Sequence, residues 1–370
     1  MEETKKLYPI KFCTIQDEYN WGHEEFKLAD LGYKDSLVRE GWLAGNSIGE
    51  LMDTYIDRIS GDNTYEYYGR QFPVCIRQLS INGDLPLQVH PGDEIAAQRY
   101  DFLGKEKLWY VLGAGKNARI LAGFRDNCNA SDFYAACEND RTDEMMNIIA
   151  PYPGLALKIP SGVPHAASGD MEILEIAESS PLDFCLNGRG HVVSEDEFDP
   201  QLSLVDALDF IKFEKFMTDP SNGNTLVDIP AFTATKMNLT DPLRCNNAEY
   251  DSFIVYCCVS GAASIQIQVL GQTADFPLKA GETMLIPAEC QDFTIVPTAE
   301  GTVLIEVTSN RVETDEYIDP KVSAKLPGGR IEYYYERSKD ISCKRLRRHG
   351  SACRMRRTSQ RRSRCQTRRS

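Results

Sequence analysis

Short apolar runs separated by turn residues dominate residues 72–176. Six of them contain β-branched or aromatic residues: 72–79, 85–90, 108–112, 118–124, 156–159 and 172–176. Gly, Pro, Asn and Asp stand between these runs, and each run has the length of a strand rather than of a helix. The pattern therefore predicts a β-rich unit.

A second β-rich block follows, with runs at 253–256, 263–269, 276–278, 283–287, 293–296 and 302–307. Strands spaced by about 8–12 residues without long helices are typical of an antiparallel barrel or sandwich. Segments 157–166 and 278–288 also resemble each other, because in each a strand ends at Ile-Pro before a turn. This weak duplication indicates two jelly-roll units, of which the first carries a histidine, His165, at the turn.

Helical spacing of apolar residues occurs in two places. Residues 131–149 and 203–218 both show it, and Ser131 could cap the first helix. We therefore predict a mainly β fold of two jelly-roll barrels with helical insertions. We expect an N-terminal barrel over 1–200 with a helical insertion at about 128–150, a helical linker over 201–227, a C-terminal barrel over 228–310, and a tail over 311–370.

Composition is that of a soluble globular chain: 370 residues, 42% hydrophobic and 26% charged. There is no apolar run near the ~20 residues that span a bilayer, and the charged N-terminus does not resemble a signal peptide. These features predict a cytoplasmic protein. The 12 cysteines lack paired spacing, so we expect mostly buried small side chains rather than disulfides or a zinc cage.

Charge is unevenly distributed. Residues 341–370 contain 12 of the 41 basic residues and no acidic one, which leaves 29 basic against 55 acidic residues, a net charge of −26, in residues 1–340. Such an acidic body argues against nucleic acid or an anionic membrane as a partner. The tail could be an Arg-rich arm that binds RNA or an acidic protein. It could instead be a solvated end, disordered from about residue 340, or a carboxyl end translated in an altered frame. We favour these last two alternatives, neither of which gives the tail a function.

Candidate chemistry centres on two of the five histidines. Gln88 and His90 lie two apart in a predicted strand and therefore share a face, and His165 follows the Ile-Pro turn of another strand. An amide oxygen with two imidazole nitrogens suits a divalent metal such as zinc. Two buried, hydrogen-bonded histidines without a metal are the alternative, and spacing alone does not decide between them.

Several motifs carry a resemblance to a family. They are Tyr8-Pro-Ile-Lys-Phe, Trp21-Gly, Gln88-Val-His-Pro-Gly-Asp-Glu, Gly104-Lys-Glu-Lys-Leu-Trp-Tyr-Val-Leu, Ile159-Pro-Ser-Gly-Val-Pro-His-Ala and Glu172-Ile-Leu-Glu-Ile. In this order they resemble the type I mannose-6-phosphate isomerases, and the second β block resembles the C-terminal cupin of that family. The resemblance covers most of residues 8–308.

The resemblance implies two cupin-like barrels and one zinc ion that serves the interconversion of mannose 6-phosphate and fructose 6-phosphate through a cis-enediol. It implies Gln88, His90 and His165 as metal ligands. It also implies Lys105 beside the substrate and Glu175 in the wall of the active site, both as candidate catalytic residues. The expected partner is a small sugar phosphate; neither a membrane nor nucleic acid is expected.

Three positions depart from the family pattern. The family's glutamate ligand falls on Lys107, with Glu106 one residue away, its catalytic arginine falls on Cys185, and its phosphate-side serine falls on Pro86. Arg189 lies near the arginine position and is our candidate for substrate binding. We expect Lys107 to face the same cavity as the histidines and Glu106 to face away.

Three hypotheses follow. The first is a working metal-dependent aldose–ketose isomerase, favoured by Gln88, His90, His165 and Lys105. The second is a catalytically impaired relative that acts as a sugar-phosphate-binding or regulatory protein, favoured by the three departures. The third is a cupin whose metal serves other chemistry.

Overall fold

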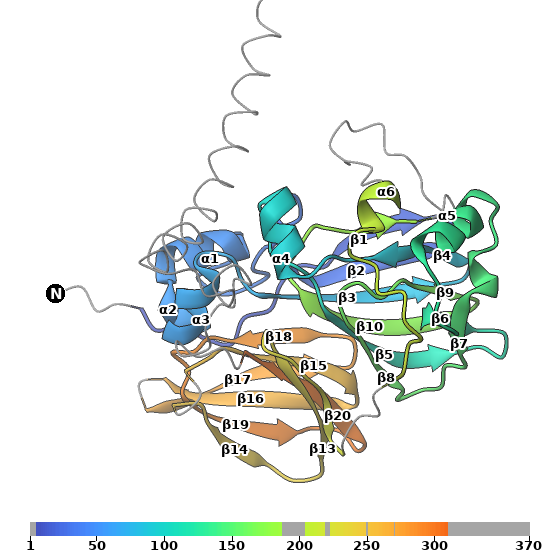
Figure 1. Cartoon of the computed structure of the whole chain (residues 1–370). Helices are drawn as coiled ribbons and strands as arrows, with labels where there is room; N and C mark the ends of the chain where they lie inside the picture. The colour runs from blue at the N-terminus through green and yellow to red at the C-terminus, as the bar shows by residue number, and fades with distance from the viewer. Residues whose placement is uncertain (1–4, 187–203, 219–222, 249–250, 270, 310–370) are drawn as a thin grey trace, which may run out of the picture.

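The structure, a computed structural model, describes residues 5–186, 204–218, 223–248, 251–269 and 271–309. Four antiparallel sheets form two β units that lie against each other (Figure 1). The prediction of a mainly β fold is confirmed. Arg189 and the basic tail lie outside the described residues.

The N-terminal unit consists of a six-stranded and a five-stranded sheet. The first has the order β1 (Ile15–Tyr19), β2 (Gly22–Leu28), β3 (Val74–Ile81), β10 (Met171–Glu178), β5 (Lys107–Ala114), β8 (Ala156–Ile159). The second has the order β11 (Phe184–Cys185), β4 (Asp84–Val89), β9 (His165–Ser168), β6 (Arg119–Phe124), β7 (Met146–Ile149). Six of these strands match the predicted runs to within a few residues.

The C-terminal unit also consists of two sheets. One has the order β12 (Thr225–Asp228), β13 (Thr233–Leu239), β20 (Thr302–Thr308), β15 (Ile254–Ser260), β18 (Thr283–Ile286). The other has the order β14 (Leu243–Asn246), β19 (Asp292–Pro297), β16 (Ala262–Val269), β17 (Gln272–Lys279). Its interior is filled by apolar side chains such as Phe293 and Ile295.

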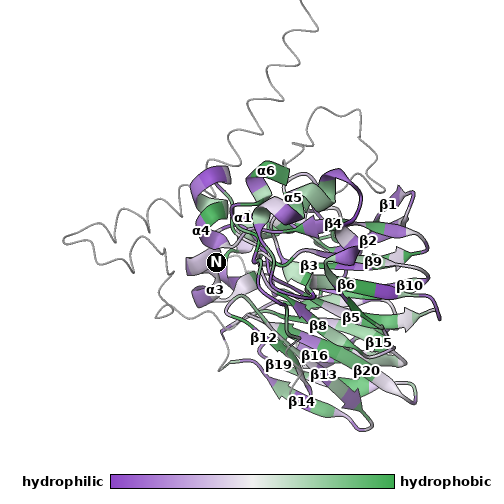
Figure 2. Ribbon diagram, turned by 45° about the vertical axis from the view of Figure 1, so that its right-hand side comes forward, coloured by the Kyte–Doolittle hydropathy of each residue, from purple (hydrophilic) through white to green (hydrophobic). Residues whose placement is uncertain are grey.

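The central strands of the six-stranded sheet, β3, β10 and β5, are largely buried on both faces, and their inner side packs against the five-stranded sheet. Alternation along β10 directs Ile173 and Glu175 inward and Leu174 and Ile176 outward. The outward pair belongs to a large core that continues into the C-terminal unit, and apolar residues run along β5, β15 and β20 (Figure 2). The second unit therefore supports the sheet that carries Glu175.

Short helices lie between β2 and β3, where the sequence pattern did not indicate them. They are α1 (Ile48–Tyr55), α2 (Asp57–Ser60) and α3 (Asp62–Tyr68). The first begins with a capping box, since Ser47 and Glu50 bond each other's backbone amides. Beyond β4 lie α4 (Asp93–Ile95) and a π-helical turn over Ala96–Tyr100.

The prediction of helix over 131–149 is wrong in its second half. Helix α5 covers Ala130–Glu138, a 3-10 turn covers Thr142–Glu144, and Met146–Ile149 form β7. These last residues pair with β6, and their backbone hydrogen bonds complete the sheet edge. Tertiary pairing thus overrides the helical spacing of the apolar residues.

The predicted helix over 203–218 is also wrong, because only Leu204–Ala207 (α6) is helical. Downstream amides bond the N-terminal unit: Lys212 donates to the carbonyl of Gly162 at 2.9 Å and Phe216 to that of Phe124 at 2.9 Å. Residues 208–218 consequently run along the N-terminal unit without a helix. No helix in the described part of the chain is long and apolar enough to cross a membrane.

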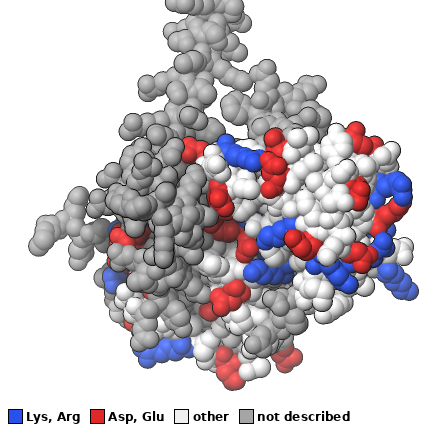
Figure 3. Space-filling model, viewed as in Figure 1, with Lys and Arg blue, Asp and Glu red and all other residues white. Residues whose placement is uncertain are grey.

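On the face drawn in Figure 3, basic and acidic side chains of the described residues alternate rather than form blocks of one sign. Several are paired at the surface, such as Arg141 with Glu144 and Arg99 with Asp209. Exposed pairs of this kind contribute little to stability. The charges that define a site are therefore those buried inside the N-terminal unit.

Gly61→Ala should destabilise the protein by at least about 2 kcal/mol. Gly61 joins α2 to α3 at φ +87°, and an added Cβ would lie 2.0 Å from the carbonyl oxygen of Asp251. The control is Gly281→Ala, where φ is +81° and the added Cβ would have no atom of another part of the chain within 4 Å. Denaturant unfolding should show the larger loss for Gly61→Ala; equal losses would mean that the contact with Asp251 is unimportant.

Candidate active site

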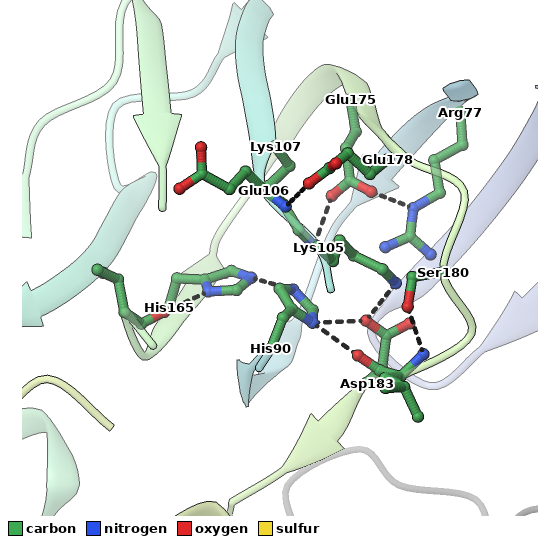
Figure 4. A network of polar contacts seen from close by, with 12 residues as sticks. Arg77, His90, Lys105, Glu106, Lys107, His165, Glu175, Glu178, Ser180 and Asp183 are labelled. Atoms are coloured by element: carbon green, nitrogen blue, oxygen red, sulfur yellow. Dashed lines mark hydrogen bonds and ion pairs between the residues drawn. The ribbon is translucent and has the colours of Figure 1, made fainter. Parts of the chain in front are cut away.

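Two buried histidines meet inside the N-terminal unit. In the β4–β9 register Gln88 lies directly opposite His165, and His90 follows directly after β4 ends at Val89. The Nε2 atoms of His90 and His165 are 3.2 Å apart, and both side chains are almost fully buried (Figure 4). The structure thus brings together two of the residues that the sequence suggested as ligands, His90 and His165, and places Gln88 opposite His165 in the strand register.

The outer nitrogens of both imidazoles are already bonded. His165 Nδ1 lies 2.9 Å from the carbonyl oxygen of Val163, and His90 Nδ1 lies 3.1 Å from that of Leu182 and 2.9 Å from Asp183 Oδ1. All three partners accept hydrogen bonds, so both Nδ1 atoms carry the proton and the Nε2 lone pairs face each other. This is the arrangement of metal-binding histidines, and on one tetrahedral zinc the two nitrogens would be roughly 3.3 Å apart.

The opposite wall is built around Glu175. Strand register places Arg77, Glu175 and Trp109 side by side on β3, β10 and β5. The carboxylate accepts hydrogen bonds from Arg77 Nε at 2.6 Å, Trp109 Nε1 at 2.7 Å and Lys107 Nζ at 3.1 Å. Burial opposes ionisation, but the charges of Arg77 and Lys107 hold the pKa of Glu175 far below its ordinary value.

Lys107 is fully buried and lies on the side of the sheet that carries Glu175 and faces the histidines, as predicted. Burial lowers the pKa of its amine to about 8, although Glu175 opposes that shift. Burial and then the charge of Lys107 lower the pKa of His90 to about 4 and that of His165 well below its ordinary value. Glu106 instead lies 3.7 Å from Lys158, a β8 residue on the outer face of the sheet, so the expected opposite orientation is confirmed.

A second ion pair links the two walls. Lys105 Nζ lies 2.8 Å from Asp183 Oδ1, the same oxygen that contacts His90. The charge of Lys105 holds the pKa of Asp183 well below its ordinary value although burial opposes this. Lys105 therefore lies in one polar group with the histidines, and Glu175 lies in a second group whose Trp109 ring packs edge-on against His165 (Figure 4).

Two members of this network were not anticipated from sequence, Arg77 and Asp183. Arg77 also bonds Glu24 at 2.7 Å, which extends the network to β2. A signal for Arg77 does exist: it is a charged residue inside the apolar run 72–79. Asp183 gave none, because it lies in a loop before the two-residue strand β11.

The other two departures from the family pattern adjoin Gln88. Pro86 precedes it by two residues on β4, and Cys185 lies opposite it in the β11–β4 register. Cys185 is therefore on the face that carries Gln88, whereas the register shift between Leu85 and Gln88 interrupts the alternation at Pro86. Arg189, our candidate for substrate binding, lies outside the described residues.

The donor set differs from the zinc centre that the resemblance implies. The two imidazoles suit a metal, but Glu175 is taken up by three donors, and the described residues contain no group of three or more His, Cys, Asp or Glu placed to hold an ion. At about 5 Å and an effective dielectric of about 20, the ammonium of Lys107 would repel a divalent ion by roughly 6 kcal/mol. The residues present do not fit that centre.

Comparison with known proteins gives a consistent set of relatives, although no protein-family model matches the sequence. The mannose-6-phosphate isomerase ManA of Bacillus subtilis is 23% identical over 323 residues, which cover 79% of this chain and 97% of the relative. A mannose-6-phosphate isomerase of Streptococcus mutans is 22% identical over 269 residues, which cover 68% of this chain and 78% of the relative.

Solved structures agree on the fold. The mannose 6-phosphate isomerase from Bacillus subtilis superimposes with a TM-score of 0.68 at 20% identity, over 81% of this chain and 99% of the other. A variant of the phosphomannose isomerase from Salmonella typhimurium gives a TM-score of 0.63 at 14% identity, over 82% and 99%. The chain is thus similar to mannose-6-phosphate isomerases along most of its length, and it shares the fold of their solved structures.

Proposed function

We propose that the N-terminal unit binds a sugar phosphate and slowly interconverts its aldose and ketose forms, with mannose 6-phosphate and fructose 6-phosphate as the substrate pair. The observation that carries the proposal is the meeting of His90 and His165, with their Nε2 lone pairs turned inward, beside the Lys105–Asp183 and Lys107–Glu175 pairs. The names of the relatives support the choice of substrate.

The reaction moves a proton between two neighbouring carbons and places negative charge on an oxygen in the enediol stage. A base with a pKa near the working pH serves the first step best, and a fixed positive charge serves the second. Lys105 and Lys107 supply positive charge in this cavity. Glu175 is a poor base at neutral pH because Arg77 and Lys107 hold its pKa so low, and the proposal therefore expects slow turnover.

A second candidate function is a sugar-phosphate-binding or regulatory protein without turnover. The buried ion pair between Lys107 and Glu175 favours it, because that pair stands where the family resemblance implies a metal ligand. Both candidate functions predict that the protein binds the sugar phosphate. The isomerase would also form product, whereas the binding protein would not. A cytoplasmic location remains a prediction. Neither of the two candidate functions assigns a chemical step to zinc.

Lys105→Met should weaken binding of mannose 6-phosphate by at least about tenfold. The substitution removes a nearly buried cation from the cavity, and hydrogen bonds to charged groups contribute about 1.5–3 kcal/mol. Calorimetric titration measures the affinity, and a coupled assay for fructose 6-phosphate measures turnover. Lys158→Met, on the outer face of β8, is the control that should bind as the wild type does. Unchanged affinity in Lys105→Met would remove this cavity from the proposal.

A further inference from the structure

We propose that the ammonium of Lys107 has taken the place of a divalent cation, so that this site works without a metal. Where it concerns the reaction, the inference rests on the proposed function. The exclusion of a metal ion does not depend on the reaction, because it rests only on the charges that surround the histidine pair.

The first step concerns what His90 and His165 require. Their Nδ1–H groups donate hydrogen bonds to backbone carbonyl oxygens. Their Nε2 atoms lie 3.2 Å apart, and in the neutral imidazoles no polar hydrogen lies between these two atoms. Such a pair is a cradle for a cation. Among the described residues of the facing wall, however, Lys107 is the fully buried group that already carries a positive charge toward both imidazoles.

The second step concerns the anions that a metal would need. Glu175 accepts hydrogen bonds from Lys107, Arg77 and Trp109. Asp183 is shared between Lys105 and the outer nitrogen of His90. The buried Glu175 and the partly exposed Asp183 are thus each matched to a lysine of the chain, and a divalent ion would add charge that neither of them balances.

The third step concerns what the lysine supplies in return. It presents one fixed positive charge from the rigid strand β5, held by Glu175 on β10. A charge preorganised in a closed site stabilises an oxygen that becomes negative without the cost of reorganising solvent. The substrate class that suits this arrangement is a sugar with neighbouring carbonyl and hydroxyl oxygens.

The test is zinc content of the full chain, measured by elemental analysis after incubation with zinc and gel filtration. The wild type should retain far less than one zinc per chain, and chelator should leave its melting temperature unchanged. Lys107→Glu should retain one zinc per chain, and the added change His165→Ala should abolish that retention. Lys107→Arg, which keeps the charge, should behave as the wild type does.

Stoichiometric zinc in the wild type, lost in His165→Ala, would overturn the inference. Lys107→Gln guards against a folding defect in Lys107→Glu, and its melting transition is recorded first. If either variant folds and neither takes up zinc, the lysine is not what excludes the metal, which also overturns the inference. These readouts need no substrate, so failure of the proposed isomerisation would appear separately, in the coupled assay.

Discussion

Lys107→Glu should raise the affinity of the protein for zinc by about four orders of magnitude. The change removes a repulsion of roughly 6 kcal/mol and introduces a carboxylate beside His90 and His165, and each 1.4 kcal/mol corresponds to a factor of ten. Competition with a chromogenic chelator measures the affinity of the wild type and the variant under the same conditions.

Lys107→Arg is the matched control, since it keeps a positive charge in the same position and should not gain affinity. Equal zinc affinity in the wild type and Lys107→Glu would show that Lys107 moves aside when a metal arrives. In that event the repulsion between Lys107 and the metal ion would not lower the affinity for zinc.

Lys107→Met should destabilise the protein by about 3–5 kcal/mol, the usual cost of breaking a buried ion pair by removing one partner. Glu175 would keep the bonds from Arg77 and Trp109 but lose the balancing charge of the lysine. The double change Lys107→Met with Glu175→Gln removes both charges and should lie within about 1–2 kcal/mol of the wild type. Arg77 would still be paired with Glu24 in that variant.

Denaturant unfolding of the two single variants and the double variant gives the coupling energy between Lys107 and Glu175. The pH dependence offers an independent check. The pKa of Glu175 is lowered in the folded state, so its contribution to stability is full above its unfolded pKa of about 4.3 and is lost as the pH falls below that value. Glu175→Gln should therefore lose less stability on acidification than the wild type. Additive effects and parallel acid profiles would show that the pair contributes nothing to stability.

Strands were predictable here because their apolar runs are short and bounded by turn residues. The helices were not, and two examples show why. Met146–Ile149 have apolar positions that suit a helix, yet their pairing with β6 decides for a strand. Beyond α6, the segment from Lys212 to Phe216 bonds the backbone of the N-terminal unit instead of itself. Both outcomes depend on partners far away in the sequence.

The site shows the same division. Alternation along one strand placed Gln88 and His90 on one face, and it placed Lys107 opposite in direction to Glu106. The partners of these residues come from other strands, so local spacing contains no information on Arg77 beside Glu175 or on Asp183 between Lys105 and His90. The exchange of a metal ligand for a lysine was visible from the resemblance, but its balancing by a buried carboxylate needed the register of β10 and β5.

The most direct test of the account is formation of fructose 6-phosphate from mannose 6-phosphate by the wild-type protein with and without chelator. We expect slow formation of product at the same rate in both conditions, and its loss in His165→Ala. Absence of product in both conditions would contradict the proposed isomerisation. Rapid turnover that chelator abolishes and zinc restores would contradict the claim that Lys107 has replaced the metal.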